Sequence, residues 1–504
     1  MEEHVVERIR QRVLLEVFNL EPVASPAPSR AAWPLWTEQD KKSVRLRVLS
    51  LNAWGLPVAP KCTERAAEIA SAISSDYELV VLQEIWHIRE RNLVIAKAQQ
   101  SGFHYYHYFN PAVGFPFPMG ADSFGTGLLV LSKFPISSAL YHSFSLSGRP
   151  YALHESDFVA NKGVGLLRVE TPAGQIDVYV THLLANYNAG GKPGPGDFYQ
   201  GHRTGQSYEL TQFISATNRN KLTIVCGDFN SSPDCLELRV PRQLLSLRDA
   251  YTDTNNEDGL TFASPDNKYS HGEHPMRMDY VMYKIDKQPK GESDWHLVKS
   301  SIFKGFFTDA RGEKTPLSDH FGVKAEFIFS EPRSHVCEQQ EGGYDVVSTD
   351  EVVSPNATRA AERSCPTTTC SHCDEKQPHQ TNEDKAAADA ACLQEVQNVL
   401  FVGRNEAIGA RHTRLWRAVA FFVAALAVFV THMMSIVVSN WSWVAVLLFG
   451  MISVTEYVLT FFFLTFECST FTELINEVQL HLHLHAQRTK GMVQAKVTQV
   501  NDDK

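Results

Sequence analysis

A carboxylate and a carboxamide follow one apolar stretch at a spacing that places them on the same side of the chain. Residues 222–226 are apolar or β-branched and predict a short buried strand, which Gly227 is expected to end. Asp228 and Asn230 come next, and side chains two residues apart in extended chain point to the same side. On its own, this stretch is typical of a turn in which Asp228 and Asn230 cap backbone groups.

The arrangement recurs along the chain, which favours a functional site over a simple turn. Strand ends in α/β folds are where sites assemble from distant parts of a chain. Residues able to bind a metal ion or transfer a proton stand at such ends: Asn52, Glu84, His182, Asp228 and Asn230, with Asp319 and His320 just before the last strand. Carboxylates and amides without cysteine suit magnesium or manganese rather than zinc. No Ser or Cys has the sequence context of a nucleophile elbow, so water is the expected nucleophile.

These residues need a sheet to bring them together, and the sequence between residues 44 and 330 predicts one. Strand patterns alternate with helical patterns near 63–73 and 205–216. The expected strands cover 46–51, 79–82, 127–131, 164–169, 176–180, 222–226, 280–283 and 323–329. This alternation predicts a single α/β-type domain with substantial sheet.

Length and composition set outer limits on the function. The 504 residues exceed a single hydrophobic core, so more than one region is expected. A formal net charge of -10 argues against general nucleic-acid binding, which needs clustered lysine and arginine. The nine cysteines are scattered and odd in number, and the acidic N-terminus lacks a secretory signal pattern. A reducing, cytosol-facing environment follows for most of the chain.

Seven short motifs, in order, resemble those of the endonuclease/exonuclease/phosphatase superfamily, and within it those of the membrane-anchored animal neutral sphingomyelinases. Each motif alone is weak, and their common order carries the resemblance. They cover residues 51–55, 83–86, 125–128, 180–183, 226–230, 278–281 and 315–320. The resemblance implies a deoxyribonuclease-I-like α/β (α+β) fold over 44–330. This fold is a four-layer sandwich of two packed mixed β-sheets flanked by helices, here followed by a two-helix transmembrane hairpin.

A carboxylate and a lysine distinguish the sphingomyelinase branch. Asp157 and Lys162, followed by Gly163, resemble the pair that sphingomyelinases carry near the active site. Outside this context the pair is typical of a solvated loop. The resemblance implies that Lys162 switches between Asp157 and the substrate phosphate.

The resemblance also assigns a metal site. Glu84 is implied as the direct ligand of Mg2+, with Asn52 beside it and Asp319 supporting the metal or its waters. Mn2+ is a possible substitute. Both substrate and transition state are anionic, so the implied reaction requires neutralisation of charge at this site.

Proton transfer is assigned to histidines. An imidazole with a pKa near ~6.5 suits a general base at neutral pH, and His320 is the expected base, with Asp279 holding its tautomer. Asp228 and Asn230 are implied to orient the nucleophile and the phosphoryl oxygens. His182 is implied to donate a hydrogen bond to the developing negative charge.

The segments flanking this domain have different compositions. Residues 1–43 predict a short amphipathic helix followed by a Pro- and Ala-rich linker, and 331–395 predict a disordered acidic linker. Within the latter, Cys365, Cys370 and Cys373 offer a zinc-like spacing in a low-complexity setting. Aromatic loops such as Phe115-Pro-Phe117 fit either core packing or insertion into a membrane interface.

Two apolar stretches near the C-terminus are long enough to cross a membrane. They span 418–438 and 443–466, and only a short turn separates them. At 1.5 Å per residue, each reaches the ~30 Å of a hydrocarbon core, which predicts a transmembrane hairpin with both ends on one side. The positive-inside rule makes that side cytosolic, because arginines crowd the segment 396–417 that precedes the first stretch. The endoplasmic reticulum or another endomembrane is the expected location.

Three further features near the C-terminus remain open. Glu456 lies within the second stretch, which marks it as a functional candidate, and pairing with His432 is the alternative. The 467–504 segment is expected to form a cytosolic tail. In it, His481-Leu-His-Leu-His485 suits a metal, although an ordinary solvated tail also explains it.

The resemblance implies Mg2+-dependent hydrolysis of sphingomyelin to ceramide and phosphocholine, a phospholipase C reaction on a membrane lipid. Alternatives are another headgroup (inositol phosphosphingolipid, ceramide phosphoethanolamine or lyso-PAF) or phosphoinositide phosphatase activity. In phosphoinositide phosphatases, an aromatic residue and an arginine normally follow Asp-x-Asn, whereas Ser231 and Ser232 follow here. A nuclease would show basic loops and no membrane anchor. An inactive membrane scaffold would have lost a site residue, and none is missing. The oligomeric state stays open.

Overall fold

The computed structural model describes most of the chain outside the N-terminus and the acidic linker. The described residues are 34–56, 59–73, 76–109, 125–149, 151–152, 155, 157–158, 160–187, 196–270, 272–286, 293–330, 381–434 and 440–502. The predicted N-terminal helix, the aromatic loop at Phe115 and the cysteines of the acidic linker lie outside these residues. They therefore stay predictions.

Two six-stranded sheets form the first part of the described chain. Their strand orders are β11-β14-β1-β2-β4-β3 and β5-β6-β7-β8-β10-β9. The first sheet comprises β1 (Ser43–Asn52), β2 (Leu79–Gln83), β3 (Tyr105–Tyr108), β4 (Leu129–Ser132), β11 (Asp294–Phe303) and β14 (Gly322–Ser330). The second comprises β5 (Ile136–Ser143), β6 (Gly163–Thr171), β7 (Gly174–His182), β8 (Leu222–Asp228), β9 (Arg248–Asp249) and β10 (Asp279–Ile285). β12 (Phe306–Thr308) and β13 (Lys314–Pro316) pair separately.

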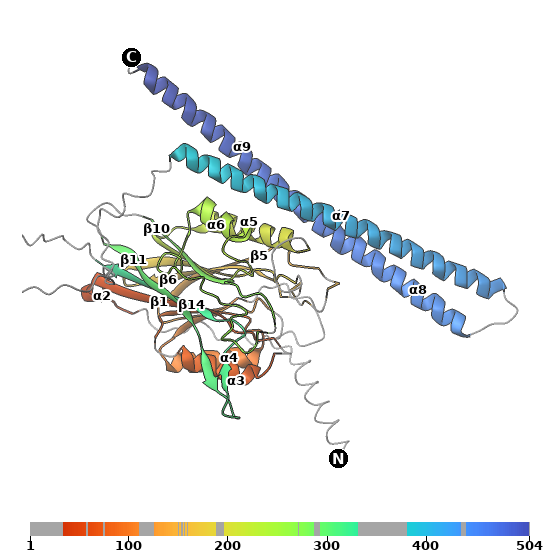
Figure 1. Ribbon diagram of the computed structural model, residues 1–504, viewed down its shortest axis with the longest axis horizontal. Helices are drawn as coiled ribbons and strands as arrows, with labels where there is room; N and C mark the ends of the chain where they lie inside the picture. The colour runs from red at the N-terminus through yellow and green to blue at the C-terminus, as the bar shows by residue number, and fades with distance from the viewer. Residues whose placement is uncertain are drawn as a thin grey trace, which may run out of the picture.

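Helices cover the outer face of each sheet, and the inner faces form the main core. α3 (Cys62–Ala72) and α4 (Ile88–Gln100) cover the first sheet, and α5 (Gln200–Thr217) and α6 (Leu236–Leu245) cover the second. The short α2 (Glu38–Lys42) precedes β1. Buried side chains from both sheets, such as Val48 and Ile224, meet between them. Figure 1 shows the four layers in this order. The predicted four-layer sandwich is confirmed.

The register of three strand pairs brings distant residues to one edge of the sandwich. β1 runs parallel to β2, with Asn52 opposite Gln83, and β7 runs parallel to β8, with His182 opposite Asp228. β10 is antiparallel to β8, with Asp279 opposite Asp228. The predicted site residues therefore end up on neighbouring strand ends.

Gly227 lies inside β8 rather than at its end, which corrects the sequence-based boundary. Its φ is +152°, and a Cβ there would stand 1.9 Å from the Thr181 carbonyl oxygen of β7. The glycine therefore permits a close approach of the two strands instead of breaking one.

Two long helical segments follow the sandwich and fold back on each other. The first is α7 (Asn382–Met434), and α8 (Asn440–Val458), a π-helical turn η3 (Leu459–Leu464) and α9 (Thr465–Asp502) together form the second. Both long helices are apolar enough to cross a membrane, and only 11% and 17% of their most apolar stretches are buried. A core helix of a soluble protein would be mostly buried, so the hairpin indicates membrane association. Figure 1 shows that the end of the hairpin where α7 leads into α8 lies well beyond the sandwich.

The helices begin earlier and continue further than the sequence analysis predicted. Residues 382–395, expected to be disordered, form the start of α7, where Thr381 and Asp384 make reciprocal capping hydrogen bonds of 3.1 and 3.0 Å. Residues 467–502, expected to be a tail, form α9. Together with residues 396–400, both segments bury an apolar stripe in one cluster with side chains of α5 and α6. The stripe and its partners are Leu393, Val396, Leu400, Phe471, Leu474, Val478, Tyr208, Leu236 and Val240.

Glu456 and His481 contact other side chains than the sequence analysis predicted. Glu456 forms ion pairs with Arg414 and Arg417 at 2.7 and 2.8 Å, so its pairing with His432 is wrong. His432 instead lies against the Trp443 ring, 4.8 Å between centroids. His481 is not simply solvated, because its Nδ1 lies 2.8 Å from the Tyr208 hydroxyl.

Glycines allow α7 and α9 to approach α5 closely, and this gives a stability prediction. A Cβ on Gly403 would stand 2.8 Å from the Phe471 ring, whereas one on Gly409, in the same helix, would meet nothing within 4 Å. Gly403→Leu should therefore destabilise the packed helices by ~1–3 kcal/mol relative to Gly409→Leu. The midpoint of thermal unfolding of the full chain in detergent measures this. Equal midpoints for the two variants would contradict the observed packing, since both gain the same helix propensity.

Candidate active site

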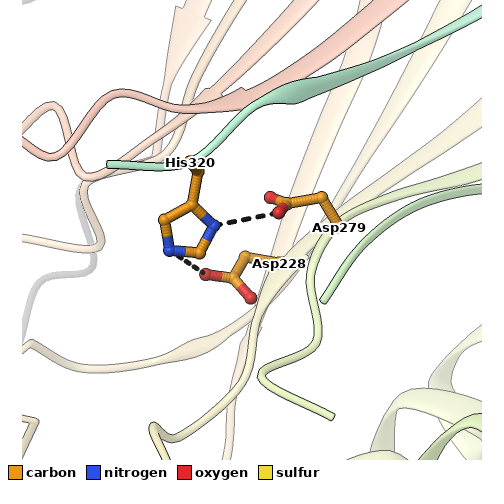
Figure 2. Close-up of side chains that lie close together, drawn as sticks. All are labelled: Asp228, Asp279 and His320. Carbon is orange, nitrogen blue, oxygen red and sulfur yellow. Dashed lines mark hydrogen bonds and ion pairs between the residues drawn. The ribbon is translucent and has the colours of Figure 1, made fainter. Parts of the chain in front are cut away.

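A histidine held between two aspartates forms the centre of the site (Figure 2). His320, just before β14, donates from Nδ1 to Asp279 Oδ2 at 2.9 Å, and its Nε2 faces Asp228 Oδ2 at 4.0 Å. Asp279 begins β10 and Asp228 ends β8, so two neighbouring strands supply the carboxylates. All three residues are buried, with exposed fractions of 7% or less. The arrangement fixes the imidazole tautomer and leaves Nε2 free to accept a proton.

Asn52 connects this centre to Glu84. Its Nδ2 donates to Glu84 Oε1 and to Asp228 Oδ2, both at 3.0 Å. The Glu84 Oε2 atom is buried and has no hydrogen-bond partner among the described residues. A buried carboxylate oxygen without a partner is costly, and a bound cation would satisfy it.

Backbone strain marks two of these residues. Glu84 and Asn230 have φ values of +60° and +48°, a left-handed conformation that residues other than glycine rarely adopt. Each such residue costs on the order of 1–3 kcal/mol, and such strain is concentrated at functional sites. In Asn230, the amide donates to the Leu183 carbonyl at 2.9 Å, and the backbone N–H donates to Asp228 Oδ1 at 2.8 Å.

A lysine and a second histidine form the other side of the site. Lys162 is 2% exposed and pairs with Asp157 Oδ1 at 2.8 Å. Its Nζ also lies 3.0 Å from His182 Nε2, which in turn is 3.6 Å from Asp228 Oδ2. A protonated lysine can only donate, so His182 Nε2 accepts here. The predicted donation from His182 to a substrate through Nε2 therefore requires Lys162 to leave that atom.

Charge crowding shifts the pKa values of several groups. Burial, and after it the charge of Asp279, raise the pKa of Asp228 to about 6, although His320 and two hydrogen bonds oppose the rise. Burial likewise raises the pKa of Asp319 to about 6, with Glu84 adding to the rise. Burial lowers the pKa of His182, helped by Lys162. Several buried carboxylates thus lie close together without enough positive charge to balance them, as expected of a site that binds a cation.

His320 shows opposed effects on its pKa. Burial lowers its pKa, but the carboxylates of Asp279 and Asp228 outweigh burial and raise the pKa well above the usual value. A divalent cation among the same carboxylates would offset part of their charge and so favour the neutral imidazole that a general base needs.

The described residues contain one group of three possible metal ligands within a small radius. Asp228, Asp279 and His320 each offer one atom, and these atoms lie within 4.8 Å of one another. Asp319 lies next to this group in sequence and accepts from the Ser318 hydroxyl at 3.1 Å. The carboxylates of the site thus offer two candidate positions for a cation, the unpartnered Glu84 oxygen and this group.

All ten residues singled out in the sequence gather around this edge of the sandwich, but three supporting residues were missed. Tyr187 donates its hydroxyl to Asp157 Oδ2 at 2.8 Å, and Ser318 Oγ accepts from the His320 backbone N–H at 3.2 Å. Arg65 of α3, 1% exposed, donates to the Ala53 and Leu317 carbonyls at 2.7 and 3.1 Å. It ties the end of β1 to the segment before His320. Of these three, only Ser318 carried a sequence signal, because it lies within the 315–320 motif.

The chain is similar to several known proteins. Residues 49–320 match the model of the Endonuclease/Exonuclease/phosphatase family. The chain is 31% identical to "Sphingomyelin phosphodiesterase 2" of Homo sapiens over 297 residues, which cover 56% of this chain and 64% of the human protein. The Mus musculus protein of the same name is 31% identical over 58% of this chain and 68% of its own.

Two further comparisons concern a yeast protein and a bacterial structure. The chain is 34% identical to "Inositol phosphosphingolipids phospholipase C" of Schizosaccharomyces pombe over 41% of this chain and 45% of the yeast protein. A crystal structure of beta toxin from Staphylococcus aureus aligns with a TM-score of 0.44 and 19% identity, over 56% of this chain and 99% of the toxin. The family model covers more than half of the chain, and the predicted resemblance is confirmed: the chain belongs to the endonuclease/exonuclease/phosphatase family.

Proposed function

We propose that this protein is a Mg2+-dependent phosphodiesterase that hydrolyses sphingomyelin to ceramide and phosphocholine. The observation that carries the proposal is the buried His320–Asp279 pair beside a carboxylate, Glu84, with an unsatisfied oxygen. This arrangement provides a base for water and a position for a cation within one site. Similarity to proteins named sphingomyelin phosphodiesterase supports the choice of substrate.

Glu84, Asn52 and Asp319 are the residues proposed to hold Mg2+ or Mn2+. Glu84 offers its free Oε2, Asn52 lies within hydrogen-bond distance of Glu84, and Asp319 carries a carboxylate whose pKa is raised partly by Glu84. Oxygen ligands of this kind suit these cations. When bound, the cation neutralises charge on the phosphoryl oxygens.

The chain's own residues supply the proton transfers. His320 Nε2 takes a proton from the attacking water, while Asp279 holds the imidazole through Nδ1 and stabilises the imidazolium that forms. Attack of the water oxygen on phosphorus breaks the bond to the ceramide oxygen. This oxygen leaves and takes up one proton, which balances the proton that His320 removed from water. Asp228 and Asn230 are proposed to orient the water and the phosphoryl group. Lys162 and His182 are proposed to stabilise the negative charge that develops there.

The hairpin is proposed to anchor this site on the membrane that holds the substrate. Spans within 418–438 and 443–466 would place both hairpin ends, and the sandwich, in the cytosol, at the endoplasmic reticulum or another endomembrane. The second span would end before Phe463, because that ring contacts Phe158. Removing a two-tailed lipid from a bilayer costs ~0.8 kcal/mol per buried CH2. An enzyme tethered to the same surface gains effective concentration without new contacts.

A second headgroup has specific support. The yeast relative is named for inositol phosphosphingolipids, and its identity over the matched region is 34%. The two candidates differ only in the group attached to the phosphate, so the same residues would act on either. An inactive scaffold is disfavoured, since all ten predicted residues are present and gathered.

A headgroup panel tests the proposal. The full chain in detergent micelles is given sphingomyelin, ceramide phosphoethanolamine, an inositol phosphosphingolipid, lyso-PAF and a phosphoinositide, with and without Mg2+. We expect Mg2+-dependent release of phosphocholine from sphingomyelin at the highest kcat/KM. Preferred release of inositol phosphate would show that the substrate is an inositol phosphosphingolipid, and the proposed hydrolysis of the phosphodiester would still hold. Inactivity on all five lipids would overturn the proposed function.

The pH dependence tests the His320–Asp279 pair. The base form of His320 is lost as pH falls through its raised pKa, and removing the Asp279 charge should lower that pKa. Asp279→Asn should therefore move the acid limb of kcat/KM to lower pH, by about one pH unit or more, alongside a ~10²-fold loss of rate. Asp286→Asn, an exposed change just after β10, serves as the control. An acid limb that stays in place or moves to higher pH would contradict the assignment.

A further inference from the structure

The base of the transmembrane hairpin touches the same stretch of chain that holds Asp157. The Phe463 ring meets the Phe158 ring edge to face, with centroids 5.8 Å apart. The Arg414 guanidinium lies 3.8 Å from the centroid of the Tyr151 ring. Phe158 directly follows Asp157 in sequence, and Tyr151 lies a few residues before it. The hairpin therefore contacts the site from outside the sandwich through two aromatic side chains.

A π-helical turn determines the position of Phe463. The turn η3 interrupts the helix, and the Thr465 hydroxyl donates to the Thr460 carbonyl, five residues earlier, at 3.1 Å. π-turns are uncommon and occur frequently at functional sites. Here the turn leaves Phe461 and Phe462 outward, 57% and 61% exposed, whereas Phe463 is half-buried against Phe158. Three consecutive phenylalanines thus have different surroundings.

A buried carboxylate determines the position of Arg414. Glu456, 6% exposed, accepts from Arg414 at 2.7 Å and pairs with Arg417 at 2.8 Å. Of these two arginines, Arg414 is the one that lies over Tyr151. This ion pair gives the charge of Glu456, which lies in an otherwise apolar helix, a structural role. It holds Arg414 at the position where α7 meets Tyr151.

From Asp157 the contacts lead directly to the site. Asp157 Oδ1 pairs with Lys162 at 2.8 Å, and Oδ2 accepts from Tyr187 at 2.8 Å and from the Ala185 N–H at 3.2 Å. Lys162 then reaches His182 Nε2 at 3.0 Å. A shift of Phe158 away from its place would withdraw Asp157 from Lys162, because the two residues are adjacent in the chain.

We propose that the hairpin base positions the active site: Phe463 and Arg414 hold Phe158 and Tyr151 in place, and this keeps Asp157 in position to pair with Lys162. The hairpin is then more than an anchor, since it sets the geometry of the phosphate-binding side. Phe463 and Arg414 are positioning residues that do not touch the substrate. This inference rests on the proposed function for the identity of the site.

Two matched pairs of variants test the proposal in the full chain in detergent micelles. Phe463→Ala is compared with Phe462→Ala, and Arg414→Ala is compared with Arg417→Ala. We expect the first member of each pair to lower kcat at least ~10-fold with KM within about twofold, since a misplacement of about 1 Å can cost 10²-fold. The second member should stay within about twofold of wild type. Tyr151→Phe, which keeps the ring under Arg414, should retain activity, and Tyr151→Ala should not.

A second measurement separates this proposal from the choice of substrate. Hydrogen exchange of peptides containing Asp157 should be faster in Phe463→Ala than in Phe462→Ala, with equal exchange in the strands of the sandwich. If the wild type acts on none of the lipids tested, the proposed function fails and the exchange result still decides this inference. Equal kcat and equal exchange within each pair would overturn it. Faster exchange throughout the sandwich would also overturn it, since that result means general destabilisation.

Discussion

His320→Ala should lower kcat for sphingomyelin roughly 10³–10⁴-fold, the largest effect expected of a single substitution. A positioned general base typically contributes ~10²–10⁴-fold, and the expected loss lies in the upper part of that range. Among the described residues, His320 alone combines a hydrogen bond from Nδ1 to Asp279, at 2.9 Å, with an Nε2 facing the interior of the site. KM should change little, because the proton transfer occurs in the transition state. Release of labelled phosphocholine under saturating substrate measures the loss.

His296→Ala is the matched control, because His296 is an exposed histidine on β11. It should retain full activity. Activity of His320→Ala within about tenfold of wild type would leave the hydrolysis in place but assign the base elsewhere. His182 would then be the next candidate, since burial and Lys162 keep its imidazole neutral by lowering its pKa.

Glu84→Gln should lower kcat/KM on the order of 10³-fold and weaken the response to Mg2+. The substitution keeps shape and hydrogen bonding with Asn52 but removes the negative charge of the unpartnered oxygen. A metal ion contributes several kcal/mol of charge stabilisation to such a transition state. Titration of activity with Mg2+ should show a higher half-saturating concentration in the variant than in wild type.

A calorimetric titration with Mg2+ decides between two positions for the cation. If the cation binds at Glu84, His320→Ala should keep the Mg2+ affinity of wild type, measured by calorimetry. If it binds in the group of Asp228, Asp279 and His320, then His320→Ala should lose the affinity and Glu84→Gln should keep it. The exposed change Glu257→Gln controls for a general loss of negative charge. Unchanged Mg2+ response in Glu84→Gln would contradict the proposed metal ligand.

Local patterns predicted the strand ends of the site correctly, because each depends on a few neighbouring residues. Apolar stretches ending in Asn52, Glu84 and His182 became β1, β2 and β7 of two packed sheets. The order of strands along each sheet depends on long-range pairing, which local patterns in the sequence do not show. For the same reason the role of Arg65, which joins two segments far apart in the chain, was not predictable.

In the hairpin, amino-acid composition led to a wrong prediction. Residues 382–395 are polar enough to suggest disorder, yet Cys392 and Leu393 are buried in one cluster with side chains of α6. In α9, Phe471, Leu474 and Val478 follow a helical spacing that was available in the sequence. The partner of Glu456 was not predictable, because Arg414 lies on another helix and its choice depends on how the two helices pack.

The most direct test of the central proposal is hydrolysis of sphingomyelin in water enriched in oxygen-18, with and without Mg2+. Attack of water on phosphorus predicts that the label enters only phosphocholine, that ceramide carries none, and that the reaction stops without the metal ion. Label in the ceramide hydroxyl would show attack at carbon and contradict the proposed chemistry, as would turnover of sphingomyelin that is independent of a divalent cation.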